Sequence, residues 1–127
     1  MKEHKIQEGL RHTVVKLVTK EDLASTVGTS KKESLSTTAL VLFIERTISS
    51  LIEPYLMEDE ASVTSEINVK HFRPAHIHES VRCIVHLKFV EGHKLFFDVA
   101  VFNEQHNEIA IGAHSRSIVK LNEDIKP

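Results

Sequence analysis

Residues 39–52 form the most apolar stretch of the chain. Apolar side chains recur there on nearly every face of an α-helix, which is typical of a helix that is buried. One small sheet packed against one side cannot cover such a helix. The segment therefore predicts either a sheet that wraps around the helix or a second subunit that covers the remaining apolar surface.

Glu45 stands inside this apolar segment, where a carboxylate is out of place. Burying a charged group costs free energy unless the group is hydrogen-bonded or paired, or is retained for a function that offsets the cost. Glu45 and Arg46 could instead mark a narrow polar stripe along an ordinary helix. The helix alone leaves both interpretations open.

The segments around the helix carry the signals of strands and loops. Residues 13–18 are rich in β-branched side chains and predict a first strand, and residues 20–35 predict a polar surface excursion with at most a helical turn. Ser36 or Thr37 can cap the helix, which we expect to run to about Leu56. Further strands are predicted from the two-residue alternation of residues 61–71, 81–89, 95–102 and 108–121.

One long helix followed by a meander of strands predicts an α+β fold with an antiparallel sheet of about five strands. The strand predicted over residues 81–89 is expected to direct five apolar side chains to one face: Val81, Cys83, Val85, Leu87 and Phe89. A wrapped sheet and a dimer are both found in the hot-dog fold, which this pattern resembles. We expect residues 1–127 to form a single domain of this kind.

Composition narrows the partners and the compartment. The chain has 16 Lys and Arg against 18 Asp and Glu, which disfavours nucleic-acid or membrane-surface binding through bulk charge. Residues 1–9 lack the apolar core of a secretory signal, and residues 39–44 are too few to span a bilayer. Cys83 is the single cysteine, so we expect no internal disulfide and a cytoplasmic location.

The spacing of three polar residues is similar to that in a known enzyme family. Thr37 precedes Glu45 by eight positions, residues 54–56 read Pro-Tyr-Leu at the predicted helix end, and His71 closes the next strand. Residues 112–116 add the sequence Gly-Ala-His-Ser-Arg. Together these motifs resemble the fluoroacetyl-CoA thioesterase branch of the hot-dog thioesterases, over about residues 36–119.

The resemblance implies an acyl-CoA thioesterase in which Thr37, Glu45 and His71 are catalytic. Thioester hydrolysis needs water or a carboxylate at the carbonyl carbon, and a group that stabilises the charge developing on oxygen. Glu45 can attack directly or act as a general base on water, and His71 can orient water, protonate the thiolate or hold the oxyanion. Thr37 can donate a hydrogen bond from its hydroxyl or from a backbone N–H near the helix start.

Helix geometry keeps two of these residues apart. Eight residues of α-helix rise about 12 Å, so Thr37 and Glu45 on one continuous helix cannot both touch the same small group. Either Thr37 precedes the helix on a chain that folds back, or the site combines the two residues from opposite subunits. We favour the second arrangement, because the resemblance implies acyl-CoA sites at the interface of a homodimer, which can pair further into a tetramer.

Three more residues are candidates for substrate binding. Thr64 corresponds to a small glycine near the substrate in the family that the chain resembles, and residues 28–32 stand where that family has a phenylalanine lid. The sequence therefore does not predict fluoroacetyl selectivity. His114 and Arg116 alternate onto one face of the last strand, where a structural ion pair and a contact with CoA phosphate are the alternatives.

The remaining candidate residues do not predict a metal site or a cofactor. His71, His76 and His78 invite a metal interpretation, but no Cys or Asp completes a tetrahedral set, so we expect no metal site. Cys83 lies in the apolar register of its strand and is expected in the core.

We therefore predict an enzyme that hydrolyses a small or medium acyl-CoA, in which CoA is part of the substrate. The alternative is a non-catalytic hot-dog module that binds an acyl-CoA or acyl-carrier ligand. A hot-dog dehydratase is a third possibility, although the hydratase-type motif is not found in the sequence.

Overall fold

The computed structural model describes residues 5–122, and the ends of the predicted domain, residues 1–4 and 123–127, lie outside the described residues. The elements follow in the order β1 (Arg11–Leu17), η1 (Lys20–Asp22), α1 (Ala24–Val27), α2 (Thr37–Ile52), η2 (Glu53–Tyr55), β2 (Glu60–His71), β3 (Ser80–Glu91), β4 (Lys94–Phe102) and β5 (Glu108–Lys120). One long helix and five antiparallel strands confirm the predicted α+β arrangement.

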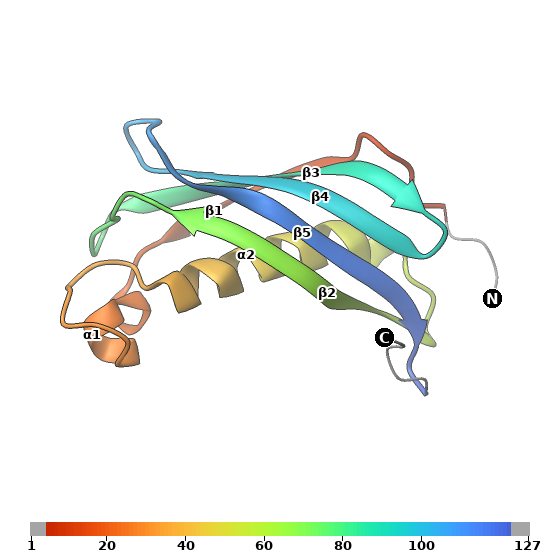
Figure 1. Ribbon diagram of the computed structural model, residues 1–127, viewed down its shortest axis with the longest axis horizontal. Helices are drawn as coiled ribbons and strands as arrows, with labels where there is room; N and C mark the ends of the chain where they lie inside the picture. Colours follow the sequence, from red (N-terminus) through yellow and green to blue (C-terminus); the bar gives the residue numbers. More distant parts are fainter. Residues whose placement is uncertain (1–4, 123–127) are drawn as a thin grey trace.

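The strands form one sheet in the order β1-β3-β4-β5-β2, so β1 and β2 are its two edges. Figure 1 shows the sheet curved over α2, which runs along its concave face. The short helix α1 lies near the start of α2, within the segment expected to be a surface excursion. Only the short turn η2 and a few loop residues separate α2 from β2, so side chains of the helix and of this edge strand can contribute to one site.

Both ends of α2 follow from local chemistry. Ser36 is the N-cap, and its Oγ accepts a 3.0 Å hydrogen bond from the backbone N–H of Ala39. The α-helix ends at Ile52, earlier than the predicted Leu56, and Pro54 lies in the 3₁₀ turn η2 that follows. Proline lacks the backbone N–H that would continue the α-helical hydrogen bonds. None of the described helices is long and apolar enough to cross a membrane.

The core lies between one side of α2 and the inner face of the sheet. Four residues repeat at helical spacing along α2 and are fully buried: Leu40, Ile44, Ile48 and Ile52. They belong to one cluster with the inward-facing residues of β3 and β4, and burying each such side chain contributes about 1.5–3 kcal/mol. The opposite side of α2 is less covered, and Leu42 there is 47% exposed. The sheet thus covers only part of the apolar helix.

Phe89 does not lie on the inner face of β3, contrary to the prediction. The pairing of β3 with β4 shifts register between Leu87 and Phe89, and Phe89 is 55% exposed. One extra residue in a strand reverses the alternation of all side chains that follow it. Val90, one position later, packs against the core instead.

Candidate active site

Glu45 lies near the middle of α2 and is partly buried. Thr64 of β2 donates a 2.9 Å hydrogen bond from its hydroxyl to Oε2 of Glu45. Both residues line a hollow of about 440 Å³, whose other lining residues are Leu42, Arg46, Ser49, Ser62, Val63 and Arg116. A carboxylate held by a hydroxyl at the wall of such a hollow can act on a carbonyl carbon or on a water molecule placed there.

Arg116 ties the elements around Glu45 together from the interior. Its Nη1 donates hydrogen bonds of 2.8 Å to Ser49 Oγ and 2.9 Å to Ser62 Oγ, and its Nη2 donates one of 2.8 Å to the Glu45 backbone carbonyl. The residue is 4% exposed. These partners belong to α2 and β2, so the guanidinium of β5 fixes the backbone that carries the carboxylate. The sequence did not reveal Ser49 and Ser62 as its partners.

His114 is also buried beside this carboxylate. It is 2% exposed, its Nε2 lies 3.4 Å from Thr64 Oγ1, and its ring meets Phe97 edge to face. Burial, with a smaller contribution from the Arg116 charge, lowers the pKa of His114 to about 4, and the Glu45 charge opposes the shift. His114 and Arg116 are both almost fully buried, and their predicted contact with CoA phosphate stays a prediction. The predicted structural ion pair is not seen at Arg116, because its partners among the described residues are two hydroxyls and a backbone carbonyl and no carboxylate.

Thr37 and His71 form a second cluster at the start of α2 and the end of β2. Thr37 Oγ1 and His71 Nδ1 are joined by a 2.9 Å hydrogen bond. Partial burial lowers the pKa of His71, although a hydrogen bond with the backbone of Arg73 opposes the shift. Thr37 is the first residue of the helix, where backbone N–H groups have no intrahelical acceptor. A hydroxyl, a neutral imidazole and such an N–H can together hold water or a developing oxyanion.

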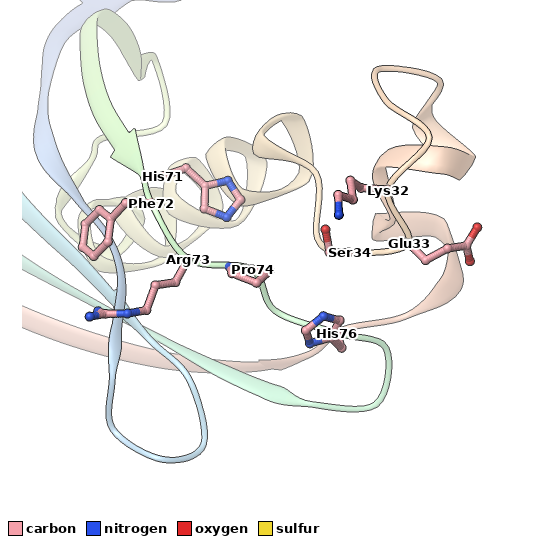
Figure 2. A pocket seen from close by; sticks show the side chains of 8 residues that line it. All are labelled: Lys32, Glu33, Ser34, His71, Phe72, Arg73, Pro74 and His76. Carbon is pink, nitrogen blue, oxygen red and sulfur yellow. The ribbon is translucent and has the colours of Figure 1, made fainter.

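His71 opens onto a separate hollow of about 610 Å³ between the loop before α2 and the segment after β2. In Figure 2 the His71 ring points toward Lys32, whereas Phe72 and Arg73 point away. Arg73 is engaged elsewhere, because its Nη1 donates a hydrogen bond of 2.6 Å to the Glu108 carbonyl. The hollow therefore has an imidazole on one side and the exposed ammonium group of Lys32 on the other.

A β-bulge in β2 allows both Thr64 and His71 to face α2. Seven positions separate the two residues, and an odd separation puts side chains on opposite faces of a regular strand. The pairing of β2 with β5 shifts register between Thr64 and Glu66, which restores a common face. The signal for this bulge was the odd spacing of two residues that were both expected in the site.

The predicted site residues thus fall into two clusters within one chain. We call Thr37 and His71 the threonine–histidine pair, and we call Glu45, Thr64, His114 and Arg116 the carboxylate cluster. Thr37 belongs to α2 itself, so the alternative of a chain that folds back before the helix is excluded. The two clusters are separated by a helix rise of about 12 Å.

The other candidate groups are occupied elsewhere. Over residues 5–122, no three His, Cys, Asp or Glu side chains are grouped in a way that could hold a metal ion. His76 Nδ1 lies 3.2 Å from Glu79 Oε1. Cys83 is buried in the core as predicted, and burial raises the pKa of its thiol to about 11. A thiol of this kind is a poor nucleophile at neutral pH.

Three solved structures share this architecture. The fluoroacetyl-CoA thioesterase is 24% identical with a TM-score of 0.85, over 91% of this chain and 90% of that one. A thioesterase superfamily member from Thermus thermophilus is 24% identical with a TM-score of 0.83, over 91% and 85% of the two chains. A hot-dog-like protein from Thermanaerovibrio acidaminovorans is 23% identical with a TM-score of 0.80, over 89% and 83%. These likenesses confirm the predicted hot-dog fold.

Sequence comparison adds the family. Mutants of the fluoroacetyl-CoA thioesterase have been solved in complex with fluoroacetate and CoA, and in complex with acetyl-CoA. Comparison with curated protein sequences gives no match. A family model described as fluoroacetyl-CoA-specific thioesterase matches residues 18–122 of this chain. The chain therefore belongs to the fluoroacetyl-CoA-specific thioesterase family, a family of thioester hydrolases.

Proposed function

We propose that this protein hydrolyses a small or medium acyl-CoA to the free acid and CoA, at sites shared between the two subunits of a homodimer. The observation that supports this most strongly is the separation of the two clusters. Thr37 bonds to His71 and Thr64 bonds to Glu45, and about 12 Å of helix lies between the two clusters. Each chain thus carries two half-sites, and a second chain is needed to bring unlike halves together.

The exposed edge of β2 supports a dimer of this form. β2 has 12 residues, lies at the edge of the sheet, and is exposed over residues 65–68. Long edge strands present unpaired backbone groups that favour pairing with another chain. In an antiparallel pairing about a two-fold axis near Asn68, Thr64 lies opposite the partner subunit's His71, because the bulge takes up one residue. This register joins the carboxylate cluster of one subunit to the threonine–histidine pair of the other.

The proposed reaction uses each half-site differently. The threonine–histidine pair holds the thioester oxygen, because a hydroxyl and a neutral imidazole can donate hydrogen bonds to the developing oxyanion. Glu45 of the other subunit acts on the carbonyl carbon, either directly or through water. Cleavage of the C–S bond releases CoA, whose thiolate takes its proton from the reacting water. On the direct route the acyl group is left on Glu45 as an anhydride, and water then hydrolyses this anhydride to the free acid and restores the carboxylate. Every step uses side chains alone, with no metal and no dissociable cofactor.

The substrate proposal rests on two features. The Glu45 hollow is bounded by Thr64 and Leu42, which leaves room for a short acyl group. The second hollow carries the exposed Lys32 beside His71, and its charge suits the anionic CoA portion. The relatives solved with fluoroacetate, CoA and acetyl-CoA make small acyl-CoA thioesters the first substrates to test.

The test is hydrolysis of short, branched and aryl acyl-CoAs, followed with a thiol reagent, by the natural protein and by Glu45→Gln. We expect turnover of at least one short acyl-CoA and a loss of at least about a hundredfold in Glu45→Gln, because base and nucleophile both require the anion. Glu58→Gln removes an exposed carboxylate and is the matched control, with unchanged turnover. No hydrolysis across the panel would favour a binding module. Full specific activity in Glu45→Gln would make Glu45 a structural charge.

A further inference from the structure

Thr64 lies between two polar groups and has only one hydrogen to donate. Its Oγ1 is 2.9 Å from Glu45 Oε2 and 3.4 Å from His114 Nε2. An ionised carboxylate can only accept, so the hydroxyl hydrogen belongs to the bond with Glu45. His114 Nε2 must then carry the second hydrogen and donate it to Thr64 Oγ1. This assigns the tautomer of His114 and gives a chain of two hydrogen bonds that ends on the carboxylate.

The surroundings of His114 hold it in that state. The residue is almost fully buried, and the Phe97 ring packs against it edge to face. Its pKa of about 4 keeps the ring neutral at pH 7, with hydrogen on one nitrogen only. Among the described residues, no group donates to or accepts from the buried Nδ1. A buried polar atom without a partner is uncommon in native proteins and points to a residue retained for its other nitrogen.

The carboxylate itself is held on one side only. Oε2 of Glu45 accepts the Thr64 hydrogen bond, and no described side chain donates to Oε1. A fixed Oε2 limits rotation of the carboxylate and leaves Oε1 for the reacting carbon or water. Preorganisation of this kind raises the rate of the chemical step more than the affinity for substrate.

We propose that Thr64 and His114 are positioning residues that orient the Glu45 carboxylate through this two-bond chain. The inference rests on the proposed catalytic role of Glu45. The β2 bulge contributes to this arrangement, because it keeps Thr64 directed toward α2 while His71 faces the same side.

The first test separates the Thr64 hydroxyl from the volume of the side chain. Thr64→Val keeps the shape and removes the hydroxyl, and we expect kcat to fall at least about tenfold while KM changes less than about threefold. Thr64→Ser keeps the hydroxyl in a smaller side chain, and its kcat should stay within about threefold of the natural protein. Wild-type kcat in Thr64→Val, or an equal loss in both variants, would overturn the positioning role. Melting temperatures show that each variant is folded.

The second test asks whether His114 acts through Thr64. His114→Gln can offer an amide N–H near the Nε2 position, whereas His114→Met fills the space without a donor. We expect kcat to fall less in His114→Gln than in His114→Met. The double variant Thr64→Val with His114→Met should lose no more than Thr64→Val alone, because one chain is already broken. Multiplied losses would show that the two residues act independently and would contradict the chain.

Failure of this inference can be told apart from failure of the proposed function. If Glu45→Gln keeps full activity, the catalytic role of Glu45 is wrong and the positioning role falls with it. If Glu45→Gln is inactive while Thr64→Val turns over like the natural protein, only the positioning role is wrong. In the Glu45→Gln background, Thr64→Val should have no further effect on residual activity.

Discussion

The two clusters carried by one chain differ in how firmly the fold holds them. The carboxylate cluster lies where α2, β2 and β5 meet, and Arg116 alone makes three hydrogen bonds across these elements. The threonine–histidine pair lies at the tips of α2 and β2, and Thr37 is exposed. A reacting carboxylate benefits from a rigid setting, whereas groups that bind a ligand at an opening must be reachable from solvent.

The comparison predicts that stability is concentrated in the carboxylate cluster. Replacing Arg116 with Met should lower the free energy of unfolding by about 3 kcal/mol. The three lost hydrogen bonds to a charged group contribute about 1.5–3 kcal/mol each, and removal of the buried charge offsets part of that loss. Arg46→Met is the matched control on the exposed side of α2 and should change it by less than about 0.5 kcal/mol. Guanidinium unfolding followed by circular dichroism measures both. Similar losses in the two variants would remove the distinction between the clusters.

Acid should weaken the carboxylate cluster through His114. Its pKa falls from 6.5 to about 4 on folding, so the unfolded chain binds more protons between these values. Stability is therefore complete above pH 6.5 and is lost as the pH falls toward 4, by up to about 3 kcal/mol for this group. His114→Gln should lose less stability than the natural protein between pH 7 and pH 4.5. Urea unfolding at the two pH values measures these losses. If His114→Gln and the natural protein lost equal stability, His114 would not be the titrating group.

The threonine–histidine pair should affect turnover more than folding. His71→Ala should lower kcat by at least about tenfold, as expected for loss of a general acid, base or oxyanion donor. The unfolding free energy should change by less than about 1 kcal/mol, because the side chain is only partly buried. His76→Ala is the control, since His76 lines the same hollow but contacts Glu79. Unchanged kcat in His71→Ala would exclude the proposed role.

Substitution of Thr37 should have a smaller effect than substitution of Arg116, His114 or His71. Thr37→Ala removes the hydroxyl and keeps the backbone N–H at the helix start, so kcat should fall only about two- to fivefold. Thr37→Ser restores the hydroxyl and should recover most of that loss. Steady-state kinetics of the two variants test this directly. A loss in Thr37→Ala as large as that in His71→Ala would mean that the hydroxyl itself does essential chemistry.

The sequence was sufficient to predict the elements because their signals are local. The apolar repeat of α2, its Ser36 cap and the alternation of the strands all depend on near neighbours. The spacing of Thr37 and Glu45 also predicted correctly that one chain would keep them apart.

Bulges and tertiary contacts could not be predicted in the same way. A bulge adds one residue without a compositional mark, so the exposed face of Phe89 was missed. The contacts of Arg116 with Ser49 and Ser62 join residues far apart in sequence, and serine is common on surfaces. The burial of His114 against Phe97 depends on how β4 and β5 pair, which no local pattern in the sequence marks.

The central claim is that each active site takes Glu45 from one subunit and His71 from the other. It is tested most directly with a heterodimer of one Glu45→Gln chain and one His71→Ala chain, purified through two different tags. Both homodimers should be nearly inactive, whereas the heterodimer keeps one intact site and should show about half the natural activity. A heterodimer as inactive as its parents would contradict the account, because sites built within one chain would each carry a defect.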